Sequence, residues 1–582
     1  MTDEIVKRIE SAEVLAFPRR KAEAASSASD VAPVAQAAAA AASASSRMGG
    51  SSESAAGGHG GAGAPVGGGV DLDRACAFLP LTDLGNAERF KMRYGDAFRF
   101  CEALGWLAWD GKRWNRDQAA ALVMLAEHAT VRAIQDEAAS IRDTVGDYIV
   151  KTEGTKAAPI YTMRSDKIAG WGRTSEAANK LGAISKRAAP MLTVAPEDLD
   201  RDPMKFNVEN GTLRFDKSLE GYLELLPHDP ADLITKISPV AYDPAAECPL
   251  YDAFLARVQP DPAAADDKNT ARRFLHQWAG LSLTAETGEQ RYTFHYGKGR
   301  NGKGVWVSTV AHVLGDYAGS IRIESFLDSG KARAGGQATP DIAKLPGVRF
   351  LSTSEPPKGA TLDEGLVKLF TGEDVISARH LNKEFFDFRP VAKLTMQGNY
   401  RPKISGTDEG IWNRTILVPW PVFIPKDDRD PRLAHKLRAE GSGILNRFLD
   451  GLRDWLDCGL LLPGSVVAAT EDYRADSDPL GRFLEACTSP QIGKRVKSSD
   501  MHALFAAWAK ANGETEWTPK GLAMALKERG VAAKKSDTVF WLDIELTRKV
   551  GDFVDEHGKP LRDGEASSAG YGPDDGMDAV YD

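Results

Sequence analysis

The chain has 582 residues and a formal net charge of −9, so it is not a polycation that wraps around nucleic acid. With 42% hydrophobic and 27% charged residues, its composition is typical of a globular protein with several domains, and no apolar run could span a membrane. Its five cysteines lie far apart, without the paired spacing of a zinc site or a disulfide framework. We therefore expect a soluble, cytoplasmic protein.

The first seventy residues are expected to form a disordered leader. Between positions 21 and 70, 36 of 50 residues are Ala, Ser or Gly, which bury too little apolar surface to order a chain. Before them, the first twenty residues carry enough spaced apolar side chains for one short amphipathic helix. Two interpretations stay open for this helix: a peptide that docks on a partner, and a frayed terminus.

An α+β domain is expected to begin near residue 71. The run 106–114 alternates in polarity and turns at Asp110-Gly111, which predicts a β-hairpin. The run 207–213 predicts a strand, a tight turn and a second strand, and an extended connector follows over 228–249. Helical periodicity is expected over 118–141, 174–188, 250–285 and 432–461.

The carboxy-terminal part predicts a winged-helix-like module. Three short helices, at 480–487, 499–511 and 519–530, precede a strand at 539–544. The net charge is +4 over 481–549 and −7 over 550–582, so we expect a module that binds DNA and a disordered acidic tail. The tail either keeps the protein soluble or competes with DNA for the basic surface, and the sequence leaves both open.

The most specific motif is a glycine-rich turn between a β-prone strand at 292–296 and a helix predicted over 305–314. It matches the phosphate-binding pattern G-x-x-x-x-G-K, in which backbone N–H groups surround a phosphate and a lysine reaches its β and γ oxygens. We expect Mg²⁺-ATP to be bound there. The candidate nucleotide-binding residues are Gly297, Lys298, Gly299, Arg300, Asn301, Gly302, Lys303, Gly304 and Val305.

One position departs from that pattern. The residue after the lysine is normally Ser or Thr, whose hydroxyl ligates Mg²⁺, and here it is Gly304. Ser308 and Thr309 lie more than a helical turn further on and are expected to point elsewhere. Two outcomes stay open: water replaces the missing ligand, or Mg²⁺ binding and ATP hydrolysis are weakened.

Two later strands each end in a polar side chain suited to ATP hydrolysis. The strand 347–354 is followed by Glu355, a carboxylate that could hold Mg²⁺ or polarise the attacking water. A second strand, 391–397, leads to Asn399, whose amide could orient that water against the γ-phosphate. Glu355 is therefore the candidate metal ligand, and Lys303, Glu355 and Asn399 are candidate catalytic residues.

Two basic features complete the candidate site. The run 372–388 predicts a hairpin whose tip carries Arg379, His380 and Lys383; it could grip single-stranded DNA, although an ordinary solvated hairpin fits equally well. Arg414 directly precedes the strand 416–418 and could stabilise charge on the γ-phosphate held by a neighbouring subunit.

In this order, these motifs resemble the superfamily 3 helicases, and most closely the phage and plasmid primase-helicase family. The matching segments cover roughly residues 81–461. Two of them, around 81–87 with 109–111 and at 207–213, resemble the amino-terminal domain of phage and poxvirus relatives. The others are the loop 297–303, Ser354-Glu355, the run 366–374, Arg379, the run 383–385, the run 398–402 and the run 406–414.

The resemblance implies an AAA+-like ATPase that assembles as a hexameric ring, binds ATP between subunits and moves along single-stranded and forked DNA. In that family Lys303 is the Walker A lysine, Glu355 the Walker B acid, Asn399 the sensor and Arg414 the arginine finger. Family members often carry a second arginine where this chain has Asn413, so Arg414 is the sole finger candidate. The positions of a primase domain hold the leader, so we expect a helicase without primase activity; a separate primase as partner stays open.

The expected fold class is α/β, an AAA+-like P-loop ATPase core with an α+β amino-terminal domain and a carboxy-terminal winged-helix-like module. The expected limits are 1–70 for the leader, 71–249 for the amino-terminal domain, 250–290 for a helical collar, 291–425 for the ATPase core, 426–478 for a helical lid or connector, 479–549 for the winged-helix-like module and 550–582 for the tail.

We expect an ATP-dependent replicative helicase of a phage, prophage or plasmid, acting in the host cytoplasm. The alternative is a nucleotide-gated DNA-binding initiator or regulator with little ATP turnover, to which Gly304 gives some support. A bifunctional primase-helicase is a weaker third interpretation, because the sequence offers no set of primase carboxylates.

Overall fold

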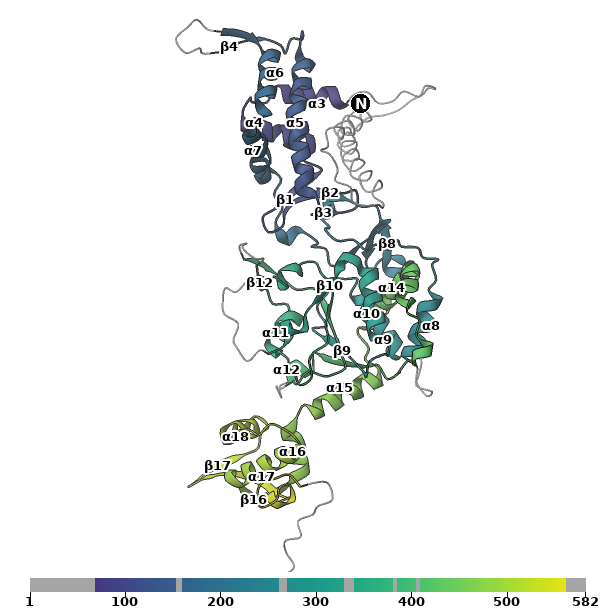
Figure 1. Ribbon diagram of the computed structural model, residues 1–582, viewed down its shortest axis with the longest axis vertical. Coiled ribbons are helices and arrows are strands. Elements are labelled where there is room, and N and C mark those ends of the chain that lie inside the picture. The colour runs from purple at the N-terminus through teal and green to yellow at the C-terminus, as the bar shows by residue number, and fades with distance from the viewer. Residues whose placement is uncertain are drawn as a thin grey trace, which may run out of the picture.

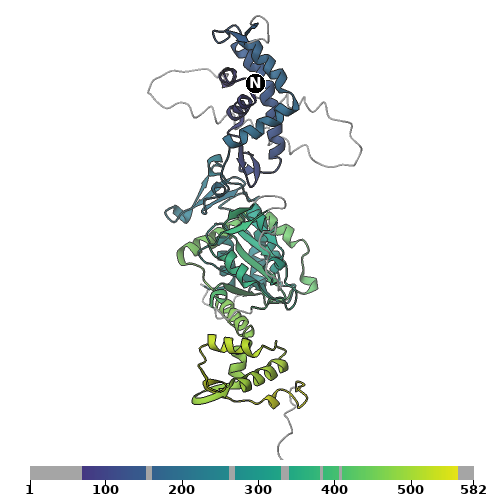
Figure 2. The ribbon, with the colours of Figure 1, turned by 90° about the vertical axis from the view of Figure 1, so that its left-hand side faces the viewer.

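The computed structural model describes residues 68–152, 160–260, 269–328, 340–379, 385–404 and 409–561. They form three bodies that follow one another along the long axis: a helical amino-terminal body, a central α/β body and a small carboxy-terminal body (Figure 1). The same order is seen after a rotation by 90° (Figure 2).

The amino-terminal body is built around the long helix α5 (Ala119–Ile141), which packs against α3, α4, α6 and α7. The hairpin β2–β3 pairs Trp109 with Trp114, and the Asp110 carboxylate accepts hydrogen bonds from the backbone N–H groups of the turn, which confirms the predicted hairpin. The other elements are α3 (Gly68–Ala77), α4 (Asp83–Tyr94), β1 (Phe98–Cys101), β2 (Gly105–Trp109), β3 (Trp114–Asn115), β4 (Ile149–Thr152), β5 (Ile160–Met163), α6 (Arg164–Ser175) and α7 (Ala178–Ala188).

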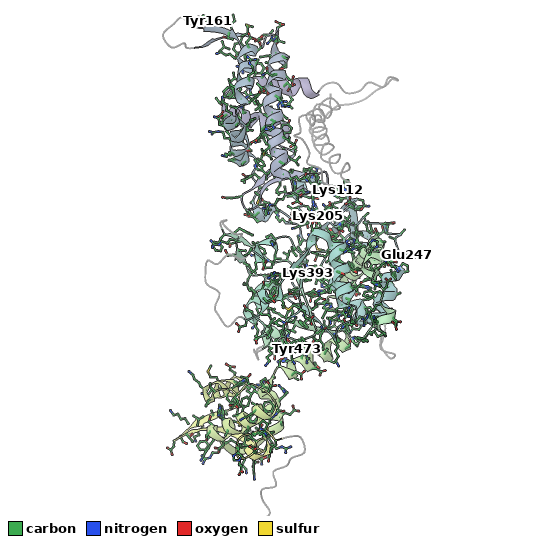
Figure 3. All side chains as sticks on the ribbon, viewed as in Figure 1. Lys112, Tyr161, Lys205, Glu247, Lys393 and Tyr473 are labelled. Carbon is green, nitrogen blue, oxygen red and sulfur yellow. The ribbon has the colours of Figure 1, made fainter. Side chains whose placement is uncertain are left out.

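A small antiparallel sheet, β6-β7-β8, links the amino-terminal body to the central one. Its strands are β6 (Lys205–Val208), β7 (Gly211–Phe215) and β8 (Leu223–Leu226), and β6–β7 is the predicted strand, turn and strand. Lys112 of the amino-terminal body pairs with Glu209, and Figure 3 shows Lys112 and Lys205 at this junction. Arg113 also pairs with Asp316 of the central body. The two bodies therefore share a polar contact beside the sheet.

The central body contains a five-stranded sheet in the order β10-β11-β14-β9-β15, in which every neighbouring pair is parallel. Parallel strands bring all their carboxyl ends to one edge of the sheet. The four strands predicted in this region are confirmed, and β10 is an addition to them. The bounds are β9 (Tyr292–Tyr296), β10 (Ala318–Ile321), β11 (Phe350–Thr353), β14 (Lys393–Gly398) and β15 (Thr415–Pro419).

Helices cover both faces of this sheet, so strands β9, β11, β14 and β15 are almost wholly buried, whereas the edge strand β10 is only partly buried. Along β15, Ile416 and Val418 enter one hydrophobic cluster and Leu417 enters the other. The first cluster also includes Phe206 of β6, which lies before the expected domain limit at 249. The helices are α8 (Pro249–Val258), α9 (Ala271–Leu281), α10 (Lys303–Leu314), α11 (Glu364–Thr371), α12 (Glu409–Trp412), α13 (Leu433–Ala439), α14 (Gly441–Cys458) and α15 (Gly464–Asp476).

Helix α15 leads from the central body to the carboxy-terminal one. It packs on β15, where Thr470 Oγ1 accepts a hydrogen bond from Leu417 N at 3.0 Å. Tyr473 is buried, donates a hydrogen bond to the Pro402 carbonyl, and marks the lower end of the central body in Figure 3.

The carboxy-terminal body follows the predicted order of three helices and a strand, with two further strands. They form a three-stranded sheet in the order β16-β18-β17, around a core of its own that includes Phe483, Phe505 and Trp541. The elements are α16 (Pro479–Cys487), β16 (Thr488–Lys497), α17 (Ser498–Ala511), α18 (Pro519–Glu528), β17 (Ala533–Lys535) and β18 (Val539–Leu546).

Candidate nucleotide site

The glycine-rich loop lies between the buried strand β9 and the first residue of α10, at the carboxyl edge of the sheet. Gly299 and Gly302 have φ values of 54° and 90°, a left-handed region that glycine enters without strain. A side chain at Gly302 would also meet Val258, since a Cβ there would lie 2.8 Å from its Cγ1. Arg300 adopts φ 54° as well, which costs a non-glycine residue roughly 1–2 kcal/mol. The loop is thus held in a conformation that an isolated peptide would not keep.

Lys303 begins α10 and is only 7% exposed. Its ammonium donates hydrogen bonds to the Gly297 carbonyl at 2.6 Å and to Asn399 Oδ1 at 3.2 Å. Burial lowers the pKa of Lys303, and the charge of Glu355 acts in the opposite direction. A buried cation held by two neutral oxygens is suited to exchange them for a phosphate.

Asn399 connects the loop to the neighbouring strands. Strand β14 lies between β9 and β11, so the residue after it faces both the loop and Glu355. Asn399 Oδ1 accepts a hydrogen bond from Gly299 N at 2.8 Å, and Asn399 N donates to Glu355 Oε1 at 2.6 Å. The structure therefore brings Lys303, Asn399 and Glu355 together at one sheet edge.

Some of the other loop residues are exposed to solvent, and others are packed in the interior. Lys298 and Arg300 are exposed, Asn301 is buried, and Val305 packs against the central hydrophobic cluster. Glu355 is exposed, and among the described residues no three or more His, Cys, Asp or Glu side chains gather into a metal-binding group.

The first hydroxyls that follow Gly304 along α10 point away from the loop. Ser308 Oγ and Thr309 Oγ1 donate to the Val305 carbonyl at 2.9 and 2.8 Å, which confirms that they face elsewhere. A Cβ on Gly304 would meet no atom within 4 Å. The side of α10 on which a serine or threonine would stand is therefore open.

Arg414 lies at the opposite edge of the sheet from the loop. Its carbonyl accepts a hydrogen bond from Tyr292 N at 2.9 Å, at the start of β9, and its guanidinium donates to the Gly410 carbonyl at 3.0 Å and to Gln290 Oε1 at 3.3 Å. The five residues of β9 separate it from the loop by roughly 15 Å at about 3.3 Å per residue. Arg414 therefore does not meet the other three candidates within one chain.

The predicted hairpin is confirmed as β12 (Ile376–Ala378) and β13 (Phe386–Phe388), which pair antiparallel between β11 and β14 in the chain. Arg379 follows β12, and its guanidinium lies 4.7 Å from the ring centroid of Phe385, which is 46% exposed. The other two predicted DNA-binding residues, His380 and Lys383, lie outside the described residues.

Sequence reasoning missed Trp420 as a neighbour of the loop. Trp420, directly after β15, contributes its backbone carbonyl as the acceptor for Asn301 Nδ2 at 3.3 Å. A backbone carbonyl has no signature in sequence, and the only available signal was that β15 would lie next to β9.

Comparison with known proteins shows what this chain is similar to in sequence. The sequence model of the family described as "D5 N terminal like" matches residues 87–260. "Putative helicase L207/L206" of Acanthamoeba polyphaga mimivirus is 25% identical over 340 residues, which cover 54% of this chain and 34% of that protein. "Putative helicase 022R" of Frog virus 3 (isolate Goorha) is 28% identical over 306 residues, 49% of this chain and 30% of that protein.

The predicted resemblance to the phage and plasmid primase-helicase family is confirmed, and the relatives that support it are viral. The chain spans about a third of the length of these viral relatives. A solved apo structure of the NrS-1 C terminal region covers 69% of this chain and 94% of that chain, with 11% identity and a TM-score of 0.37. Across the part of the chain that the structure describes, no helix is both long and apolar enough to cross a membrane.

Proposed function

We propose that this chain is an ATP-dependent replicative DNA helicase of a phage, prophage or plasmid, which hydrolyses ATP as a hexameric ring and translocates on single-stranded DNA in the host cytoplasm. The observation that carries the proposal is that Lys303, Asn399 and Glu355 are joined by hydrogen bonds through Asn399, beside one glycine-rich loop. Two viral relatives named as helicases support the same class.

The loop residues fit a nucleotide triphosphate. Backbone N–H groups of the loop and the amino end of α10 favour an anion, because a helix N-terminus carries unpaired N–H donors and a partial positive charge. Lys303 would exchange its two neutral oxygen partners for phosphate oxygens. Gly299 N, now bound to Asn399 Oδ1, would become a further phosphate donor.

Glu355 and Asn399 suit the hydrolytic step. Mg²⁺ in such sites is held by one or two carboxylates with phosphate oxygens and water, and it would neutralise charge on the phosphates. Glu355 is the exposed carboxylate at that edge and is proposed to hold the ion or to polarise the attacking water. Once phosphate oxygens accept the hydrogen bonds of Gly299 N and the Lys303 ammonium, the Asn399 amide would be free to orient this water.

Arg414 is proposed to act on the nucleotide of a neighbouring subunit. It lies at the amino edge of the sheet, while the loop lies at the carboxyl edge, so head-to-tail contacts between copies would place it beside the next loop. An arginine from a second subunit stabilises charge that develops in phosphoryl transfer.

Two surfaces are proposed to contact DNA. Arg379 on the hairpin β12–β13, with His380 and Lys383, would grip single-stranded phosphates. The carboxy-terminal body, as a winged-helix-like module, exposes Lys520 and Lys527 on α18 and two further lysines on β17, which favour duplex or forked DNA. A separate primase remains a proposed partner, and the domain limits given above remain proposals.

The decisive experiment measures ATP turnover by the full chain with Mg²⁺, with and without single-stranded DNA. We expect turnover that single-stranded DNA stimulates several-fold. Lys303→Ala should lower it by about 100-fold or more, as removal of a transition-state charge partner does. Bound nucleotide without turnover in either condition would instead favour the nucleotide-gated DNA-binding protein, for which Gly304 is the specific observation.

A second measurement separates ATP turnover from DNA binding by the hairpin. Arg379→Ala should reduce the stimulation by single-stranded DNA and leave turnover without DNA unchanged. Arg142→Ala, an exposed arginine of the amino-terminal body, is the matched control and should change neither. Equal stimulation in the wild type and in Arg379→Ala would remove the hairpin from the proposal.

A further inference from the structure

Trp420 lies directly after β15 and makes three hydrogen bonds to the elements that carry the loop. Its backbone N donates to the Tyr296 carbonyl at 2.8 Å and extends the β15–β9 ladder by one residue. Its carbonyl accepts from Asn301 Nδ2 at 3.3 Å, and its indole Nε1 donates to His295 Nδ1 at 3.1 Å. A Cβ on Gly297 would lie 2.5 Å from the Trp420 carbonyl oxygen, so the loop starts in direct contact with this residue.

His295, behind Trp420, is a fully buried residue of β9. Because a tryptophan Nε1 can only donate, His295 Nδ1 is the acceptor and the ring proton is on Nε2. The imidazole stacks on Trp306 of α10, with centroids 5.0 Å apart and an interplanar angle of 22°. The ring must stay neutral, since burial lowers its pKa to about 3 and the charge of Lys303 acts in the same direction.

These contacts connect the three elements around the loop. His295 belongs to the strand before it, Trp306 to the helix after it, and Trp420 to the segment beyond the neighbouring strand. Further along that segment, Ile424 N donates to the Arg300 carbonyl at 2.9 Å. Since Arg300 is held in a left-handed conformation, the loop needs such external support to keep its shape.

A polar pair in this position is unusual for a core. Trp420 is 2% exposed, and His295 Nε2 has no hydrogen-bond partner in the part of the chain that the structure describes. Two apolar rings would fill the same space without that cost. The His295–Trp420 pair is therefore better explained as a means of orienting the loop than as a means of stabilising the core.

We propose that Trp420 is a positioning residue for nucleotide binding, which through Asn301 and His295 holds the glycine-rich loop in the shape that accepts phosphate. This inference rests on the proposed function. Within the part of the chain that the structure describes, Trp420 forms no hydrogen bond with Lys303, Glu355 or Asn399, so it acts on the affinity for nucleotide and not on the hydrolytic step.

The test measures KM for ATP and kcat on the full chain carrying Trp420→Phe, His295→Phe or both changes. Each single variant leaves one buried polar atom without its partner, so we expect KM to rise about fivefold to tenfold with kcat within about twofold of the wild type. The double variant should be no worse than the poorer single variant, since both polar atoms are gone. Trp114→Phe, which removes another buried indole donor, to the Pro230 carbonyl, is the matched control and should change neither constant.

Thermal unfolding checks that each variant is folded. His295→Gln is a second test, because the glutamine amide oxygen can still accept a hydrogen bond from Trp420 Nε1. This variant should keep KM near the wild-type value. Unchanged KM in both single variants, additive effects in the double variant, or a fall in kcat at constant KM would each overturn the positioning role. Failure of the proposed function is distinguishable, since the wild type itself would then show no ATP turnover.

Discussion

Gly304 is the residue at which this chain departs from its motif, and the structure leaves room to restore the missing hydroxyl. A Cβ there meets nothing within 4 Å, so Gly304→Ser should fold without strain. We expect the Mg²⁺ concentration for half-maximal ATP turnover to fall about threefold to tenfold, as one added ligand worth about 1 kcal/mol would give. The measurement is a Mg²⁺ titration of turnover at saturating ATP.

Gly304→Ala is the matched control for that change. It adds the same Cβ without the oxygen, so it should leave the Mg²⁺ requirement unchanged. An equal shift in both variants would mean that helix propensity, not a metal ligand, is responsible.

His295 gives the central body a defined response to acid. Its folded pKa is about 3, against about 6.5 in an unfolded chain, so between these values the unfolded state binds more protons. Neutral His295 therefore makes its full contribution to the free energy of unfolding above pH 6.5. That contribution decreases by about 1.4 kcal/mol per pH unit as the pH falls toward 3.

His295→Phe removes this titration and should flatten the fall in the thermal midpoint of the central body between pH 6.5 and 4.5. Part of the slope should remain, because burial also lowers the pKa of His276 to about 4. Scanning calorimetry across this range is the measurement, and parallel slopes for the two proteins would contradict it.

At the scale of elements, the helices α9 and α14 cross at two glycines. A Cβ on Gly451 would lie 2.0 Å from the His276 carbonyl oxygen, and one on Gly280 would lie 2.3 Å from Leu452 N. These contacts are to backbone atoms, so neither helix can give way by rotating a side chain. The pair packs against the sheet and contributes to the cluster that supports α10.

Gly451→Ala should therefore lower the free energy of unfolding of the central body by about 1–3 kcal/mol or more. Gly182→Ala is the opposite case, because Gly182 lies inside α7 with no atom within 4 Å of its Cβ position. This change should raise the free energy of unfolding by about 0.5–1 kcal/mol. Thermal unfolding of both variants is the measurement. A stable Gly451→Ala variant would show that the two helices can separate at small cost.

The sequence predicted the elements that have a strong pattern. The strands β9, β11, β14 and β15 are apolar runs bounded by turns, and their shared edge brought Lys303, Asn399 and Glu355 into one expected site. Strand β16 was missed because it is almost wholly exposed and has no alternation of polarity. Strand β10 and helix α6 were missed as well, being short or only weakly amphipathic.

The rest of the site depends on contacts that leave no trace in sequence. Trp420 meets Asn301 through a backbone carbonyl, and the partners of Arg414 come from Gly410 and Gln290. The place of Arg414 followed from its position before β15, but its action on a second subunit stays a prediction that one chain does not test.

At the scale of the whole molecule, that prediction concerns the assembly. In the proposed ring, each site needs Lys303 from one subunit and Arg414 from the next. Lys303→Ala and Arg414→Ala should each abolish turnover alone. In an equal mixture about a quarter of the interfaces would combine the two intact residues, so about a quarter of the wild-type turnover should return.

Titration of one variant into the other, after conditions that allow subunits to exchange, is the measurement. Each variant mixed with itself is the control. No recovery at any ratio would place both residues in a site within one chain, against the roughly 15 Å that separate them along β9.

The two edges of the parallel sheet also have a genetic consequence. A subunit with Arg414 replaced keeps its own loop intact and still enters the ring, where it silences its neighbour; such an allele should be dominant over a normal copy expressed beside it. A chain whose substitution prevents folding never reaches the ring, and its allele should be recessive. Substitutions that spare the fold but remove a contact with the next subunit thus harm a partner, whereas those that prevent folding harm only their own chain.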